Sequence, residues 1–248
     1  MIIEDFIMLG TTVPEPQKKT GRTFVCSAGY SHEMRSLIRI YPLAYVKCPR
    51  RWSVSRVALE RNPQDSRNES WQLRGDRSPG AHRQINDVFE IIGKVERQER
   101  SSLMSGLCLP SIQEANNQRR SLCIIQPECI PKLTFKENPD SPDHPQLDLG
   151  VYTDGREPPA GAKRFAFQPY AEFRDAGGWH DLQVRDWGGY EFMRKHGVDR
   201  RHELAVGWRF GGRPCLLCGN MSNHRTSWLI ISVLMPLQQL SLNLEAAE

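Results

Sequence analysis

Two short runs decide the fold of this chain: TFVCSA (Thr23–Ala28) and SLIRIYPL (Ser36–Leu43). Both contain β-branched and aromatic residues, which favour extended backbone. The polar segment 29–35 between them predicts the turn of a β-hairpin. Arg39 and Tyr41 are two residues apart, so we expect them on one face of the second strand.

Similar short runs recur along the rest of the sequence. Further strands are expected at 52–59, 88–95, 121–127, 132–135, 165–173, 204–210, 215–219 and 228–234. One helix is expected at 110–120, and another from Asp186 or Trp187 to Lys195, with Asp186 as its N-cap and Gly197 as its stop. Short strands and long loops predict a mainly β fold with minor α content. We expect two OB-like β-barrels, or one compound β-unit, with one or two short helices.

The length and composition fit a soluble protein with one or two domains. The chain has 248 residues, 39% of them hydrophobic and 25% charged. Residues 138–160 are crowded with Pro, Asp and Gly, so we expect a linker or an insertion there. The domains expected on either side are 1–137, OB-like with a basic loop, and 161–248, β-rich with one helix.

The compartment expected is the cytoplasm. The longest apolar run, 228–237, contains a proline and is far shorter than the ~20 residues that span a bilayer, so no membrane association is expected. The apolar N-terminus is interrupted by acids and has no basic start, unlike a secretory signal. The seven cysteines are an odd number and fall mostly in apolar runs, which indicates reduced, buried thiols.

Most of the positive charge lies in residues 47–83. This segment has eight arginines, one lysine and four acids, a formal charge of about +5 against +4 for the whole chain. It also holds two tryptophans, and guanidinium groups with indole rings are what a phosphate backbone with stackable bases requires. The predicted contact residues are Arg39, Arg50, Arg51, Trp52, Arg67, Trp71 and Arg74. Alternatively, these arginines pair locally with Glu60, Asp65, Glu69 and Asp76.

The string Asp65-Ser-Arg67-Asn-Glu69-Ser permits two interpretations. Its carboxylates could hold a divalent ion, or Arg67 could bridge both acids and fix the loop. The fork geometry of arginine suits paired carboxylates, so we favour the loop clamp.

Two further sets of residues carry alternative chemistry. His180, Asp186 and Glu191 contain the groups that a Mg²⁺-dependent nuclease needs, although a helix N-cap at Asp186 would occupy its carboxylate. Cys215, Cys218 and His224 resemble half of a zinc site, but cysteines three apart on a strand point to opposite faces. We therefore expect no catalytic residues, no metal and no cofactor, with Mg²⁺ required only under the nuclease alternative.

Three groups of strings together resemble a known family. They are Ser36–Leu43, Asp65–Trp71, and His180-x5-Asp-Trp followed by Gly219-Asn-x3-His-x3-Trp-Leu-Ile-Ile. The combination is similar to an uncharacterised prokaryotic family with a dual OB-like domain, associated with mobile-element and defence gene contexts. Members often carry cysteines ahead of the His-x5-Asp-Trp string, whereas residues 168–180 here have none. The resemblance implies a fold and a setting, but no reaction.

The function expected from the sequence is non-enzymatic nucleic-acid binding. The protein would act as an accessory in a prokaryotic defence or mobile-element complex, with a protein partner there and with RNA or DNA as the ligand. The alternatives are a nuclease centred on His180 and Asp186, and a protein-interaction module whose basic segment meets an acidic partner.

Overall fold

The computed structural model describes residues 1–16, 23–44, 48–75, 88–138, 165–208, 210 and 212–234. It is mainly β with a few short helices, which confirms the expected fold class. Residues 139–160, most of the expected linker or insertion, lie outside the described residues. Within the described ranges, no helix is both long and apolar enough to cross a membrane.

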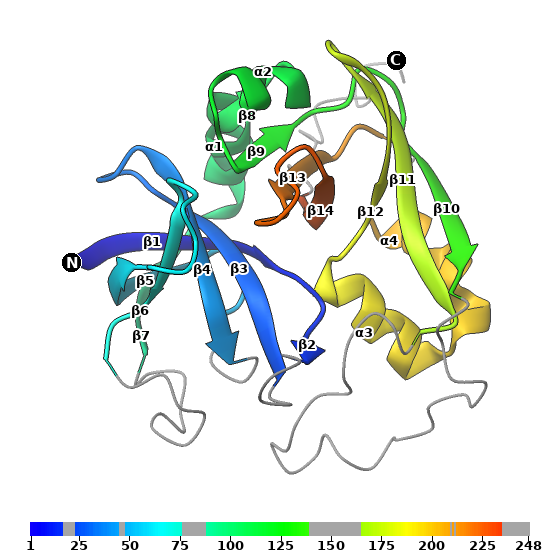
Figure 1. Ribbon diagram of the computed structural model, residues 1–248. Helices are drawn as coiled ribbons and strands as arrows, with labels where there is room; N and C mark the ends of the chain where they lie inside the picture. The colour runs from blue at the N-terminus through cyan, green and yellow to red at the C-terminus, as the bar shows by residue number, and fades with distance from the viewer. Residues whose placement is uncertain are drawn as a thin grey trace, which may run out of the picture.

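The first half forms a closed five-stranded barrel (Figure 1). Its strands are β1 (Ile2–Thr11), β3 (Thr23–Ser31), β4 (Ser36–Ala44), β5 (Ser53–Arg61) and β6 (Ser70–Leu73). They close in the order β1-β3-β4-β6-β5-β1, with only β4 and β6 parallel. Counted in chain order, β1, β3, β4, β5 and β6 are the first to fifth barrel strands. Their order around the barrel is therefore 1-2-3-5-4, which is the order of an OB fold. Two more strands, β2 (Glu15–Pro16) and β7 (Phe89–Lys94), pair outside this ring.

The closing strand β6 lies between the strands expected at 52–59 and 88–95, where the sequence indicated no strand. All four β6 residues are buried, and Trp71 packs in the barrel interior with Ile38, Ile40 and Leu59. Local residue preferences did not indicate this strand, because it has only four residues and its neighbours in the sequence are polar. It is held by pairing with β4 on one side and β5 on the other. Residues 76–87 lie outside the described residues.

The second half repeats the OB order in a more open form. Its strands are β8 (Cys108–Leu109), β9 (Leu122–Ile125), β10 (Lys132–Glu137), β11 (Phe167–Asp175), β12 (Gly178–Gln183), β13 (Cys215–Asn220) and β14 (Trp228–Leu234). One sheet runs β10-β11-β12 and the other β14-β13-β9-β8. A parallel bridge between Val184 and Ile230 joins them. The strands β9 and β10 together take the place of a first barrel strand, broken at Pro127 and Pro131, because proline cannot donate to a sheet ladder.

Five short helices lie in the described part of the chain. They are α1 (Arg97–Leu107), α2 (Ile112–Asn117), α3 (Trp187–His196), the 3₁₀ helix η4 (Val198–Glu203) and α4 (Leu204–Gly207). The α3 expectation is confirmed: Asp186 Oδ1 accepts the Gly188 N–H, and Gly197 has φ +84°. The strand expected at 204–210 is wrong. Leu204 and Trp208 are both buried at a spacing of four, which is the periodicity of one helical turn.

The two halves pack side by side through their outer strand faces (Figure 1). On β9, Cys123 and Ile125 point into the second core, while Leu122 and Ile124 pack against Ile7, Leu9 and Ala28 of the first barrel. The outer face of the second and third strands is where OB folds bind oligonucleotides. In the first barrel this face, on β3 and β4, is covered by the chain's own second half.

Candidate nucleic-acid interface

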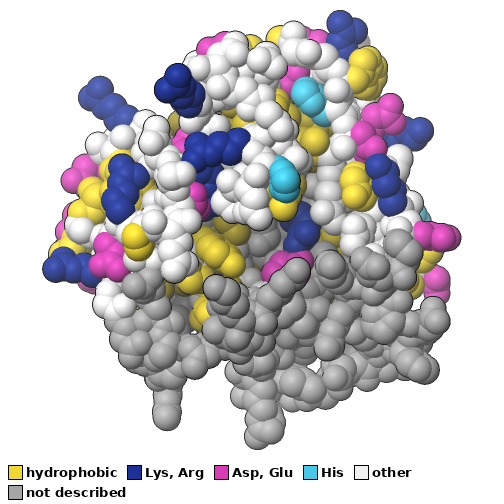
Figure 2. Space-filling model, viewed as in Figure 1, with side chains coloured by type: hydrophobic (Ala, Val, Ile, Leu, Met, Phe, Trp, Pro, Cys, Tyr) yellow, Lys and Arg dark blue, Asp and Glu magenta, His cyan; other side chains and the backbone are white. Residues whose placement is uncertain are grey.

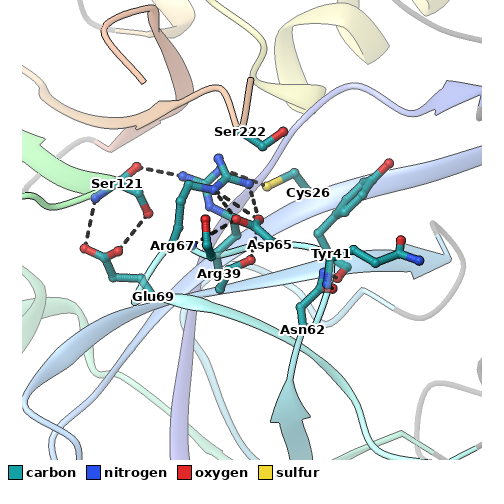
Figure 3. A network of polar contacts seen from close by, with 12 residues as sticks. Cys26, Arg39, Tyr41, Asn62, Asp65, Arg67, Glu69, Ser121 and Ser222 are labelled. Carbon is teal, nitrogen blue, oxygen red and sulfur yellow. Dashed lines mark hydrogen bonds and ion pairs between the residues drawn. The ribbon is translucent and has the colours of Figure 1, made fainter. Parts of the chain in front are cut away.

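A buried polar network lies where the two halves meet (Figure 3). Arg39 projects outward from β4 but is only 4% exposed. Its Nη2 donates to the carbonyl of Ser121 (2.6 Å), and its Nη1 lies 3.6 Å from the Cys26 sulfur. Burial lowers the pKa of Arg39, and neighbouring Arg67 lowers it further, while Cys26 opposes the shift. Arg39 therefore joins the barrels and is not available to a ligand.

The loop clamp predicted from the Asp65–Glu69 string is confirmed for Asp65. Arg67 Nε donates to Asp65 Oδ1 (2.8 Å), and Arg67 Nη1 reaches the carbonyl of Asn220 (2.5 Å). Burial alone would raise the pKa of Asp65, but bonds from Arg67 and Ser70 lower it to about 2. Glu69 takes a different partner, because its carboxylate accepts the N–H and hydroxyl of Ser121 (3.0 and 2.8 Å).

The two predicted stacking residues are also buried. Trp52 and Trp71 are 8% and 7% exposed. Each indole already faces an internal cation, since Arg100 lies 5.1 Å from the Trp52 ring and Arg61 lies 4.0 Å from the Trp71 ring. Both tryptophans of the basic segment therefore make cation–π contacts with arginines of the same chain.

Four of the seven predicted contact residues therefore serve the protein's own packing. They are Arg39, Trp52, Arg67 and Trp71. Arg74 is exposed just after β6. On the face shown in Figure 2, Lys and Arg side chains are separated by neutral and acidic ones and form no continuous stripe. The seven predicted contact residues therefore do not form one exposed surface in the described part of the chain.

Arg50 and Arg51 are brought to a cleft between the first barrel and α3. The cleft holds about 400 Å³ and is lined by Met8, Gly10, Thr11, Cys48, Pro49, Arg50, Arg51, Trp187 and Gly188. None of these described lining residues is an acid. Arg50 is exposed, and burial raises the pKa of the Cys48 thiol to about 12, so Cys48 is neutral at pH 7.

Asp186 does not line this cleft but holds Arg51, which does, and it is 1% exposed. Its Oδ2 accepts from Arg51 Nη2 (2.8 Å), Ser232 Oγ (2.7 Å) and the Val233 N–H (3.0 Å). Asp186 thus neutralises the charge of Arg51. The exposed side chain of Arg50 leaves an excess positive charge in the cleft. Clefts of this volume are large enough for a small-molecule-sized group.

The comparison with family models concerns the first barrel. Residues 3–106 match the model of a domain of unknown function (DUF8758). The DUF8758 match spans the barrel strands, β7 and α1 up to its penultimate residue. It includes the barrel side of the cleft, but not Trp187 or Asp186. A search of curated proteins found no match.

The residues of the nuclease alternative lie outside the matched residues 3–106, and each of them contacts a different partner. His180 Nε2 lies 2.9 Å from Asp175 Oδ2, Glu191 pairs with Arg194 (2.7 Å), and Asp186 is engaged as described. In the part of the chain that the structure describes, no group of three or more His, Cys, Asp and Glu residues could hold a metal ion.

The zinc residues are likewise separated, as the strand spacing predicts. Cys215 packs in the cluster between the barrels, with its sulfur 3.7 Å from Cys108, whereas Cys218 points into the second core beside Cys123. His224 lies in the exposed β13–β14 turn. The two cysteines cannot share one ion in this arrangement.

Sequence reasoning missed the cleft residues contributed by other elements. Gly10 and Thr11 end β1, and Trp187 begins α3, so they meet Arg50 only through the fold. No local pattern links these segments. Sequence reasoning also gave no role to Trp179, which is 65% exposed near the start of β12.

Proposed function

We propose that this protein binds nucleic acid, RNA or DNA, without a catalytic step. In this proposal it acts in the prokaryotic cytoplasm as an accessory subunit of a defence or mobile-element complex. The setting is supported by the sequence resemblance, and the compartment by the free cysteines among the described residues. Two OB-like barrels are a fold often used for oligonucleotides, which is support by analogy only.

The observation that carries the proposal is the cleft of about 400 Å³ with Arg50 at its rim. The positive charge of Arg50 faces solvent, and no described residue forms a hydrogen bond or ion pair with its side chain. Trp187, which is partly buried against the second core, also lines this cleft. A polyanion gains from the charge, and an unpaired base gains from the indole.

The α3 N-terminus adds little to this site. Asp186 already accepts the Gly188 N–H, so the helix end is capped from within. Nor does the nuclease alternative gain support, because His180, Asp186 and Glu191 have separate partners. A protein-interaction role at the same cleft differs from nucleic-acid binding in its ligand, and the experiment below separates them.

The test is a fluorescence titration of the full chain with labelled single strands and duplexes at two salt concentrations. Arg50→Glu should weaken binding about tenfold or more and flatten the dependence on salt, because one phosphate contact is replaced by repulsion. The matched control is Arg97→Glu, an exposed arginine at the start of α1 with the same charge change. Arg51 is unsuitable, since its loss would leave Asp186 buried without its cation.

Two outcomes would contradict the proposal. One is the absence of any salt-dependent binding of DNA or RNA by the natural chain. The other is equal binding by Arg50→Glu and Arg97→Glu. A stable complex with an acidic protein in place of nucleic acid would favour the interaction module.

A further inference from the structure

The two barrels differ in what covers their outer faces. In the first, the face of the second and third strands is packed against β9, β13 and β14. In the second, the corresponding strands are β11 and β12, with β10 beside them. Alternation buries Ala171 and Phe173 in the core, so the residues between them point away from it. The outward set is Tyr170, Glu172 and Arg174 on β11, and Trp179, Asp181 and Gln183 on β12.

This outward face carries two aromatic rings in an otherwise polar setting. Trp179 is 65% exposed and lies directly opposite Arg174 in the strand register. Tyr170 is half-buried, and Lys136 Nζ from β10 lies 3.9 Å from its ring centre. Both rings therefore belong to rigid strands and have a cationic side chain next to them.

We infer that the outer face of β10, β11 and β12 is a base-stacking surface for single-stranded nucleic acid. The inference rests on the proposed function and adds a second contact to it, distinct from the cleft at Arg50. Trp179 and Tyr170 each stack on one unpaired base. Arg174, Lys136 and Lys132 contact the phosphates between them.

The register sets the spacing of the two stacked bases. Trp179 pairs with Arg174, which lies four residues from Tyr170 on β11. At ~3.4 Å per residue the two rings are separated by roughly 14 Å along the sheet. A single strand covers that distance with a few nucleotides, within the ~4 to 16 nucleotides that one OB fold occupies.

The acids on this face do not prevent phosphate binding. Asp181 pairs with Lys136 (2.6 Å) and Glu128 with Arg174 (3.5 Å), and all four side chains are about half-exposed. The third acid, Glu172, is exposed and lies opposite Lys132 in the strand register. Exposed ion pairs of this kind contribute little, so the cations can exchange a carboxylate for a phosphate. Lys132, also exposed, adds a third cation at the edge of the face.

The surroundings of Trp179 favour bases over a protein partner. A protein interface of this size needs a central apolar cluster. In the strand register, the described neighbours of Trp179 on this face are instead Arg174, Glu172 and Asp181. An isolated indole among charges suits stacking on a single base, whose edges remain hydrated.

The experiment measures binding of oligonucleotides of about 6 and about 20 nucleotides to four forms of the full chain. The forms are the natural chain, Trp179→Ala, Trp179→Phe and Arg50→Glu. Trp179→Ala should weaken binding of single strands between about 5-fold and about 150-fold, the range observed for lost base stacking. Trp179→Phe should restore most of the loss, because a benzene ring also stacks. Binding of blunt duplexes should be unchanged by either substitution.

The outcomes separate this inference from the proposed function. If the natural chain binds strands, and Arg50→Glu weakens binding while Trp179→Ala does not, the cleft stands and the stacking surface is overturned. The surface is also overturned if Trp179→Ala weakens duplexes and single strands equally. If the natural chain binds no oligonucleotide, both proposals fail. If instead Trp179→Ala releases a bound protein, the face is a protein interface.

Discussion

Arg51 and Asp186 form an ion pair of 2.8 Å that ties the first barrel to the second. Arg51 precedes β5, whereas Asp186 caps α3. The same arginine also donates to the carbonyl of Val233 (2.9 Å). One side chain from the DUF8758 segment thus holds two elements of the second half, and the cleft lies directly beside this contact.

Asp186→Ala should destabilise the protein by about 3 to 5 kcal/mol. The substitution leaves Arg51, the Ser232 hydroxyl and the Val233 N–H without their buried acceptor. Urea unfolding followed by circular dichroism measures the change. Glu203→Ala breaks a surface ion pair with Arg200 and should leave the midpoint nearly unchanged. Equal effects of the two substitutions would contradict the structural role of Asp186.

The Asp65 clamp should make stability depend on pH in the acid range. The pKa of Asp65 is lowered to about 2 in the folded protein, below the ~3.9 of an unfolded chain. The ionised Asp65 therefore contributes fully to the free energy of unfolding above about pH 4, and this contribution is lost as the pH falls toward 2. Because the side chains of Asp65 and Arg67 are both buried, a lowering of this size corresponds to roughly 2 kcal/mol of stability.

The measurement for this clamp is a set of thermal unfolding curves between about pH 2 and about pH 6. Asp65→Asn should be less stable than the natural chain at pH 6, and the difference should shrink as the pH approaches 2. A difference that stays constant over this range would show that the Asp65 charge is not the cause.

Gly10→Ala and Gly106→Ala should change stability in opposite directions. A Cβ on Gly10 would lie 2.3 Å from the Cβ of Ser232, where β1 crosses β14, so we expect a loss of about 1 to 3 kcal/mol. Gly106 lies in α1 with open space around it, and alanine should stabilise this helix by up to about 1 kcal/mol. Chemical denaturation of both variants checks the prediction, and a neutral Gly10→Ala would contradict the close packing of the barrels there.

Cys48 should react slowly with alkylating reagents although it lines the cleft. Its pKa is raised to about 12 by burial, so only a small fraction is thiolate at pH 8. The rate of iodoacetamide labelling, followed by peptide mass spectrometry, should rise about tenfold for each pH unit from 8 to 10. A rate at Cys48 that is fast and independent of pH would be inconsistent with this environment.

The sequence was sufficient for most strands, but not for the way in which the barrels meet. The hairpin of β3 and β4, the cap at Asp186 and the stop at Gly197 follow from local residue preferences, and all three are observed. The sequence reasoning predicted neither the helix α1 nor the strand β12. The residues of β12 are mostly polar because one face is in solvent, and the short β6 depends on neighbours far away in the chain.

The candidate binding residues were harder to predict than the fold for a related reason. An arginine beside a tryptophan has the same sequence signature whether it contacts a ligand or another part of the chain. Arg39 and Arg67 satisfy carbonyls of Ser121 and Asn220, which lie in the second half. Only the three-dimensional packing of the two barrels distinguishes these from Arg50.

The covered wall of the first barrel limits what residues 3–106 can do when separated from the rest of this chain. Detached, they would present Ile7, Leu9 and Ala28 to water, together with an arginine stripped of its carbonyl acceptor. Such a fragment should self-associate or be captured by chaperones. Within this protein, residues 3–106 are packed against the second half, and we expect their solubility to depend on that contact.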